Sequence, residues 1–224
     1  MQFKCIIIGG SGATGRQLLK KLIKNKNCTK RTSIGRRKLE NYSAETKLKH
    51  IVVDSLLNLS STEQYWINQD VLFNCIGTTK QRAGGADEFY NIEFGISNEI
   101  ARMGSASNIN HASLISASGA DHQKWAKKWI HPLFYIKTMG KKEQTIVSNF
   151  SFKYQTIFKP GMLIRMLNKT NFFEKCLEFF GLGLRVEDLA LAMMKDAEEG
   201  FENKRSIKTK YFIGNNEIIT SIKD

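Results

Sequence analysis

The chain has 224 residues, 42% of them hydrophobic, which suffices for one large domain or one domain with a small appendage. Its net charge of +13 would attract phosphate, nucleic acid or an anionic membrane, although a solvated basic surface is the favoured explanation, and no specific nucleic-acid-binding motif is present. The chain lacks a secretory-signal pattern, an apolar run of the ~18 residues that span a membrane, and metal-ligand spacing among its four cysteines, so we expect a cytoplasmic protein without a metal.

Apolar runs alternate with segments of helical period along the chain as far as Pro160. Strands are expected at residues 3–9, 32–35, 50–53, 71–76, 113–116 and 155–159. Helices are expected at residues 14–26, 62–68, 87–104 and 125–149. This alternation predicts an α/β fold, namely a Rossmann-type doubly wound parallel sheet.

After Pro160 the pattern changes to helices at 172–180 and 186–199 and a late strand at 211–213. These segments are too short for an independent domain. We therefore expect a single domain over 1–224, in which 162–224 forms a substrate-side extension or small C-terminal lid. Such a lid would cover the carboxyl edge of the sheet, where open α/β sheets bind ligands.

A glycine loop follows the first strand directly and opens the first helix. Glycine permits the sharp turn, the close approach of backbone to a pyrophosphate and the packing of helix on strand. The helix N-terminus then offers free N–H groups to phosphate. A lone glycine motif also occurs in plain turns, but this strand–loop–helix context indicates a dinucleotide site. The candidate residues are Gly9, Ser11, Gly12, Ala13, Thr14 and Gly15.

The end of the second strand indicates which dinucleotide binds. An NAD site usually has an acidic residue there, which accepts from the ribose 2′-hydroxyl. Here Arg36 and Arg37 occupy the segment, and the first acid is Glu40. Because an arginine fork pairs well with phosphate, these residues predict NADP(H) as the cofactor, with a charged loop facing water as the alternative.

With these residues in view, the chain resembles atypical short-chain dehydrogenases/reductases and, more narrowly, the Tat-interacting-protein-like family of NADPH-binding proteins. The resemblance covers most of residues 1–165. The matching stretches are GGSGATGRQLL at 9–19, IGRRKL at 34–39, VVD at 52–54, IGTT at 76–79, SGAD at 118–121 and KPG at 159–161. The C-terminal third matches poorly.

The resemblance implies roles for individual residues. The glycines would hold the pyrophosphate, and the two arginines the 2′-phosphate. It also places Asp54 by the adenine, Gly77 and Thr78 along the cofactor, and Pro160 with Gly161 near the nicotinamide.

The catalytic residues depart from the family pattern. Short-chain reductases use Tyr-x-x-x-Lys on one helix, in which the lysine binds the ribose and favours the tyrosinate. Tyr135 matches the tyrosine, but Met139 stands at the lysine position, and no such pair occurs elsewhere in the chain. The usual serine aligns with Ala117, so Ser116 or Ser118 would have to replace it.

The segment 122–134 carries two tryptophans among lysines, which indicates an interfacial or ligand-facing loop, or tryptophans that cap the core while the lysines face solvent. The leading hypothesis is an NADP(H)-binding short-chain reductase with weak or altered oxidoreductase activity on a small carbonyl substrate. A nucleotide-gated module that binds a protein partner is the second, favoured by Met139. A charge-driven binder of nucleic acid, or a peripheral membrane protein without a transmembrane segment, is the third.

Overall fold

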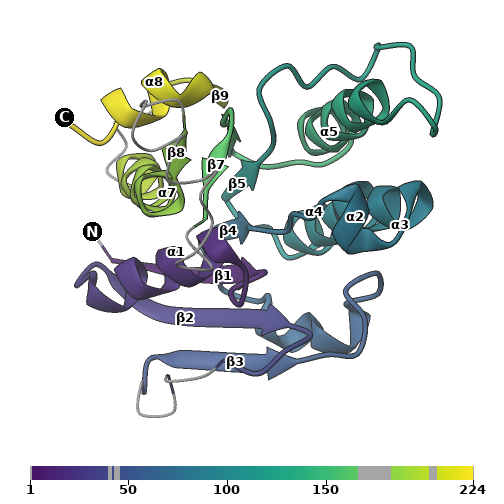
Figure 1. The fold of residues 1–224 in the computed structure, drawn as a ribbon. Coiled ribbons are helices and arrows are strands. Elements are labelled where there is room, and N and C mark those ends of the chain that lie inside the picture. The colour runs from purple at the N-terminus through teal and green to yellow at the C-terminus, as the bar shows by residue number, and fades with distance from the viewer. Residues whose placement is uncertain (1, 40–41, 43–45, 166–182, 202–205, 224) are drawn as a thin grey trace.

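The computed structural model describes residues 2–39, 42, 46–165, 183–201 and 206–223. Its centre is a seven-stranded sheet in which all paired strands are parallel (Figure 1). The strands in spatial order are β3 (Leu48–Val52), β2 (Cys28–Gly35), β1 (Phe3–Ile8), β4 (Val71–Asn74), β5 (His111–Ile115), β6 (Tyr154–Lys159) and β9 (Thr209–Ile213). A separate pair joins β7 (Leu163–Ile164) to β8 (Leu184–Arg185). The predicted Rossmann-type fold is confirmed.

Helices cover both faces of this sheet. They are α1 (Ala13–Lys24), α2 (Lys80–Ala83), α3 (Ala86–Tyr90), α4 (Ile96–Ala106), α5 (His131–Ser148), α7 (Val186–Phe201) and α8 (Gly214–Thr220), with a 3₁₀ turn at η1 (Ser60–Tyr65) and a π-helical turn at η2 (Asn91–Gly95). Along β1, Cys5 and Ile7 pack in the core beneath α1 and α7, whereas Ile6 and Ile8 pack in the core beneath α4 and α5. This alternation is why the strand is apolar throughout.

Three predicted helices differ from the structure. Residues 125–130 are a loop, and α5 begins only at His131. Its first turn contains Pro132, and a proline disfavours helical backbone in the residue before it, so the helical pattern upstream does not propagate. The segment predicted as a helix at 62–68 is the shorter 3₁₀ turn η1, and the helix predicted at 87–104 is interrupted by η2. The helix predicted at 172–180 lies outside the described residues.

The described part of the C-terminal extension contributes to the main layers. β9 pairs with β6 at the sheet edge, and α7 packs on α1 through buried residues that include Leu189 and Met193. The role of 162–224 as a lid stays a prediction.

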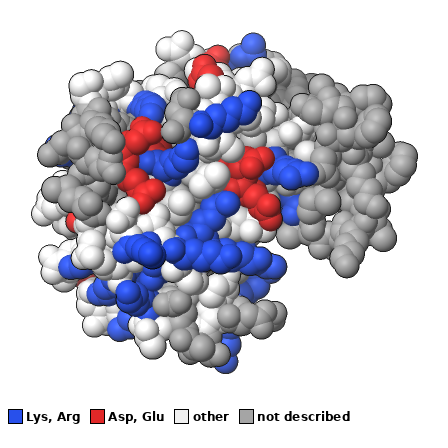
Figure 2. All heavy atoms as spheres, turned by 90° about the vertical axis from the view of Figure 1, so that its left-hand side faces the viewer, with Lys and Arg blue, Asp and Glu red and all other residues white. Residues whose placement is uncertain are grey.

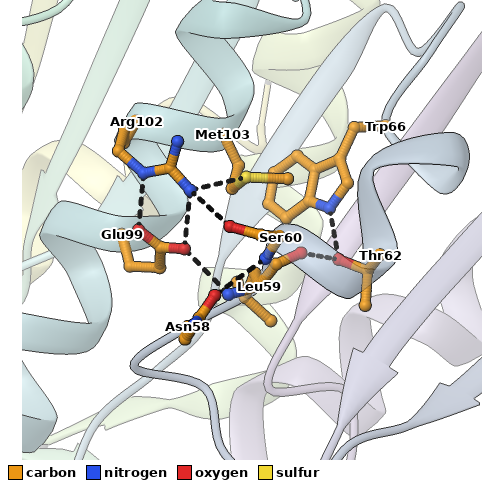
Figure 3. Close-up of polar contacts among 8 residues, drawn as sticks. All are labelled: Asn58, Leu59, Ser60, Thr62, Trp66, Glu99, Arg102 and Met103. Atoms are coloured by element: carbon orange, nitrogen blue, oxygen red, sulfur yellow. Dashed lines mark hydrogen bonds and ion pairs between the residues drawn. The ribbon is translucent and has the colours of Figure 1, made fainter.

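A polar network fixes the connection between β3 and β4 against α4 (Figure 3). The carboxylate of Glu99 accepts from the backbone N–H of Leu59 at 2.8 Å and from the Arg102 guanidinium at 2.7 Å. The Thr62 hydroxyl donates to the Leu59 carbonyl at 2.6 Å and accepts from the indole of Trp66, which is fully buried. The network therefore holds the segment that continues from β3 past the carboxyl edge of the sheet.

Figure 2 shows that the side of the molecule at the left of Figure 1 carries basic side chains interspersed with acidic ones. The excess positive charge is therefore not a uniform patch on that side. Within the described ranges, no helix combines the length and apolar composition needed to cross a bilayer.

Candidate cofactor and active site

Two glycines of the loop after β1, Gly9 and Gly15, stand where a side chain would collide with the backbone of the loop or of its neighbours. Gly9 has a left-handed φ of +91°, and its carbonyl accepts from the N–H of Gly12 at 2.9 Å. A Cβ at Gly15 would lie 2.2 Å from the Gly9 carbonyl oxygen, which no side chain tolerates. The N-cap of α1 is Gly12, which has no side chain to satisfy the first N–H groups of the helix. These groups remain available to an anion.

The strand order reverses between β1 and β4, and this is where ligands bind in open α/β sheets. A cavity of about 450 Å³ lies there. Its lining residues are Ser11, Gly12, Ala13, Thr14, Arg16, Arg37, Cys75, Ile76, Gly77, Arg82, Ile115, Leu163 and Arg165. The described lining contains four arginines and no carboxylate. Its charge suits a ligand that carries several phosphates.

Two further cavities extend this cleft past Arg37, which lines all three. One of about 230 Å³ includes Gly9, Arg36, Leu56, Gly77 and Thr78 among its lining residues. The other, of about 630 Å³, is lined by Ser11, Arg16, Lys20, Arg37, Lys38, Leu39 and Tyr42. The structure thus brings Arg36, Arg37 and the glycine loop together. Asp54 is exposed and is absent from the described lining of these cavities.

At its other end the cleft continues into a cavity of about 300 Å³ that shares Leu163 and Arg165 with the central one. Its lining residues are Ser116, Ala117, Tyr135, Pro160, Gly161, Met162, Leu163 and Arg165. Three predicted residues, Ser116, Tyr135 and Pro160, therefore meet in one cavity. Ser118 is exposed and outside this lining, and its backbone N–H donates to the Pro160 carbonyl at 2.8 Å.

The hydroxyl of Ser116 belongs to a buried polar chain. It donates to Glu143 Oε1 at 2.5 Å, and Glu143 Oε2 accepts from Lys159 Nζ at 2.9 Å. Glu143 and Lys159 are each about nine-tenths buried as side chains, so the charges compensate each other in a poorly solvated place. The arrangement fixes the rotamer of Ser116 beside the cavity.

Tyr135 lies in the same cavity without a lysine one turn further on. Burial raises the pKa of Tyr135 to about 12, the nearby carboxylate of Glu93 adds to this, and Arg165 opposes it. Met139, at the usual lysine position, is 3% exposed and forms part of the core. The phenol is therefore a proton donor at neutral pH and a poor base.

Lys142, also on α5, does not take the place of the missing lysine, because its ammonium group is engaged in other contacts. Its ammonium group lies 3.0 Å from Glu93 Oε2 and donates to the Ile76 carbonyl at 3.0 Å. Glu93 Oε1 in turn accepts from the backbone N–H of Thr78 at 2.6 Å. Both side chains are at most 2% exposed. The pair thus ties the cofactor-side loop after β4 to α5.

His131 is a second group near the site, at the start of α5. Its ring meets the ring of Phe89 edge-on at 5.8 Å and that of Tyr135 at 6.3 Å. Burial lowers the pKa of His131, and the charge of Lys80 lowers it further. The imidazole is therefore mostly neutral near pH 7 and does not replace the missing ammonium.

Sequence reasoning missed several residues of the site. Arg82 and Arg165 lie outside the matching stretches, whereas Arg16 lies within the first of them, directly after its last glycine, and its place in the cleft was not predicted. Glu143 lies four residues after Met139 and eight after Tyr135, a helical spacing that would have placed it on the same face of α5. Nothing in the local sequence pointed to Glu93.

The fold and cleft define a dinucleotide-binding protein of the Rossmann class, with an arginine-rich phosphate region and an adjoining tyrosine-containing cavity. A family model described as NAD(P)H-binding matches residues 9–195, and the chain belongs to this family. The resemblance to short-chain dehydrogenases/reductases and to the Tat-interacting-protein-like family is confirmed, as is a nicotinamide dinucleotide as the cofactor class.

Two relatives agree with this family, and a solved structure agrees with the fold. The chain is 31% identical to the rat protein HTATIP2 over 168 residues, which are 73% of this chain and 64% of that protein. It is 27% identical to "Protein FMP52, mitochondrial" of Lodderomyces elongisporus over 179 residues, 77% of this chain and 72% of that protein. The yeast methylglyoxal/isovaleraldehyde reductase Gre2, complexed with NADPH, has a similar fold with a TM-score of 0.68 at 13% identity, covering 95% of this chain and 78% of that one.

Proposed function

We propose that this chain is an NADP(H)-dependent oxidoreductase of the short-chain reductase type, with weak or altered activity on a small carbonyl compound. The observation that carries the proposal is the continuous cleft, which runs from the arginines near the second strand, past the glycine loop, to Ser116 and Tyr135. NADPH, when bound, supplies a hydride. Arg37 would bind the 2′-phosphate, and the backbone of the glycine loop the pyrophosphate.

The described residues that line the cavity around Tyr135 favour donation of a proton to the substrate over removal of a proton from it. Tyr135, with its pKa raised to about 12, keeps its proton at neutral pH and can give it to an oxygen that gains charge. Pro160 and the Ser116 hydroxyl, fixed by Glu143, limit how a substrate lies beside the phenol. We place the substrate-side role of 162–224 at Leu163 and Arg165, because both line the cleft.

A direct test compares the two cofactors on one protein. Wild type should bind NADPH roughly tenfold or more tightly than NADH by titration calorimetry, and Arg37→Met should lose this difference while NADH binding stays the same. Wild type should then oxidise NADPH slowly with small aldehydes, methylglyoxal and isovaleraldehyde among them, and Tyr135→Phe should abolish this. Equal affinity for both cofactors would refute the cofactor assignment.

A second candidate function is a nucleotide-gated module that binds a protein partner and does no redox chemistry. Three observations favour it, namely Met139 in the core, the high pKa of Tyr135 and the engagement of Lys142 by Glu93. Normal NADPH binding without turnover on any carbonyl compound would support this candidate. For either function we propose a reducing, cytoplasmic location, which is supported by free thiols at Cys5, Cys28 and Cys75.

A further inference from the structure

The loop between β5 and α5 exposes two large aromatic side chains. We call residues 121–130 the Trp loop; it is the teal loop that projects at the upper right of Figure 1. Trp125 is 63% exposed and Trp129 is 73% exposed, whereas Trp66 is completely buried. Tryptophan is strongly buried on average in folded proteins, and exposed apolar groups that lie together mark interaction sites. The packing of the core does not account for these two side chains.

The base of the Trp loop is fixed, so the exposure of its tip is a property of the fold. The backbone N–H of Asp121 donates to the Ile136 carbonyl of α5 at 3.2 Å. A Cβ at Gly140 would lie 2.1 Å from the backbone nitrogen of His122, so the loop lies directly on the helix there. At its far end the loop leads into His131, whose ring packs against Phe89 of α3.

Lysines lie between and beside the tryptophans. Lys124 and Lys127 are exposed, and the ammonium of Lys127 lies 5.8 Å from the ring centroid of Trp125. Lys128 forms an ion pair with Asp87 of α3, so its charge is already compensated. Asp121, at the base of the loop, is the one acidic residue of the Trp loop, and its Oδ1 accepts from the backbone N–H of Gln123 at 2.9 Å. The tip therefore presents two exposed indole rings and the exposed ammonium groups of Lys124 and Lys127.

This combination matches the interface of an anionic membrane. Indole rings favour the headgroup level of bilayers, where the apolar body is buried and the N–H stays hydrated. Lysine stems follow apolar surface while the ammonium reaches the lipid phosphates. Single-stranded nucleic acid also stacks on aromatic rings, but it binds along basic grooves, whereas the Trp loop projects away from the body of the domain (Figure 1). The shape of the loop thus favours a lipid surface over nucleic acid.

We propose that the Trp loop docks this chain on anionic lipid surfaces, with Trp125 and Trp129 in the interface and Lys124 and Lys127 against the headgroups. The surface goes beyond the proposed redox function, because docking requires neither cofactor nor turnover. The chain from this loop enters α5 four residues before Tyr135, so the docked loop is directly continuous with the element that carries the phenol.

The test uses the whole protein and vesicles of phosphatidylcholine with or without phosphatidylserine. Wild type should sediment with the phosphatidylserine vesicles, its tryptophan emission should shift to the blue, and brominated lipid should quench it. The double variant Trp125→Ser/Trp129→Ser should lose both sedimentation and the shift, because its remaining tryptophan is the buried Trp66. Ile67→Ser, which removes an apolar side chain that is 58% exposed elsewhere, should bind as wild type does.

Two further double variants test how much the lysine charges contribute to vesicle binding. Lys124→Gln/Lys127→Gln should weaken vesicle binding roughly 25-fold, at about fivefold per lysine, and high salt should remove the difference. Lys24→Gln/Lys26→Gln, which changes two exposed lysines at and just after the end of α1, should have little effect. Unchanged NADPH binding and thermal unfolding would establish that the variants fold.

Three results would overturn the proposal. Wild type that does not bind phosphatidylserine vesicles, or that binds phosphatidylcholine vesicles equally well, contradicts it. So does a folded tryptophan double variant that binds vesicles like wild type. Competition by a single-stranded RNA oligonucleotide, in which RNA displaces the vesicles and needs the same tryptophans for tight binding, would reassign the loop to nucleic acid.

Discussion

The buried pair Glu93–Lys142 leads to a prediction whose size follows from the structure. In Lys142→Met the carboxylate of Glu93 stays buried with one described donor, the N–H of Thr78. Removing one partner of a buried ion pair costs about 3–5 kcal/mol. For a protein of this length we expect the melting temperature to fall by roughly 6–20 °C.

The double variant Glu93→Leu/Lys142→Met separates the charge effect from loss of packing. It leaves no buried charge at the pair, although the N–H of Thr78 loses its acceptor and the carbonyl of Ile76 loses the donor Lys142, at a cost of about 1–3 kcal/mol each. The double variant should therefore be more stable than the sum of the single changes implies, by about 2 kcal/mol or more. Lys141→Met, on the partly exposed neighbour of Lys142, is the control and should cost less than about 1 kcal/mol.

Urea unfolding followed by circular dichroism gives the free energies, and NADPH fluorescence gives the affinity. Because Glu93 and Lys142 hold the backbone of Thr78 and Ile76, each single variant should also bind NADPH about fivefold more weakly. Single and double changes that add within about 0.5 kcal/mol would refute the coupling. Unchanged NADPH affinity in destabilised variants would show that the pair supports the fold alone.

Three other predictions concern the glycine loop, the phenol of Tyr135 and the ion pair of Glu99 with Arg102 on α4. Gly15→Ala places a Cβ 2.2 Å from the Gly9 carbonyl oxygen and should abolish NADPH binding in calorimetry. An affinity within a factor of ten of wild type would contradict the role of the glycine loop in binding the pyrophosphate. Met139→Lys puts an ammonium group one turn after Tyr135, so the pKa of the phenol should fall from about 12. The pH profile of NADPH turnover should then move to lower pH, and an unchanged profile would contradict this prediction. The guanidinium of Arg102 lowers the pKa of Glu99 in the folded protein. The pair therefore stabilises the fold at pH above the ordinary carboxyl pKa of 4.5, and this stabilisation is lost as the pH falls through the lower pKa of the folded protein. The urea midpoint of Arg102→Gln should therefore depend less on pH in that range than the midpoint of wild type does.

The predicted residues that line the cofactor end of the cleft come from local sequence motifs. The glycine loop and Arg36 with Arg37 lie within short motifs whose spacing fixes their place in a strand–loop–helix unit. The contacts that decide the chemistry join distant segments, since Glu93 and Lys142 are 49 positions apart, and Ser116 and Glu143 are 27 apart. Helical spacing along α5 suggests which residues share a face, but the partner on another element follows only from packing.

The start of α5 illustrates a second limit. The apolar and basic residues before His131 have a spacing that a helix would also satisfy, and hydrophobic period alone does not distinguish a projecting loop from an amphipathic first turn. Pro132 indicated a boundary, since proline favours the first turn of a helix. A periodic pattern therefore locates such an element better than it locates its ends.

The contact at Gly140 separates a constrained part of the Trp loop from an unconstrained one. Where His122 lies on the helix, any side chain at position 140 would force the backbone apart, so evolution has little room to vary this junction. From Gln123 to Trp129 all but one of the residues are exposed, and exposed loop tips tolerate insertions and exchanges. We therefore expect that changes of sequence or length in the tip alter the surface that the loop presents and leave the junction at Gly140, and with it the start of α5, in place.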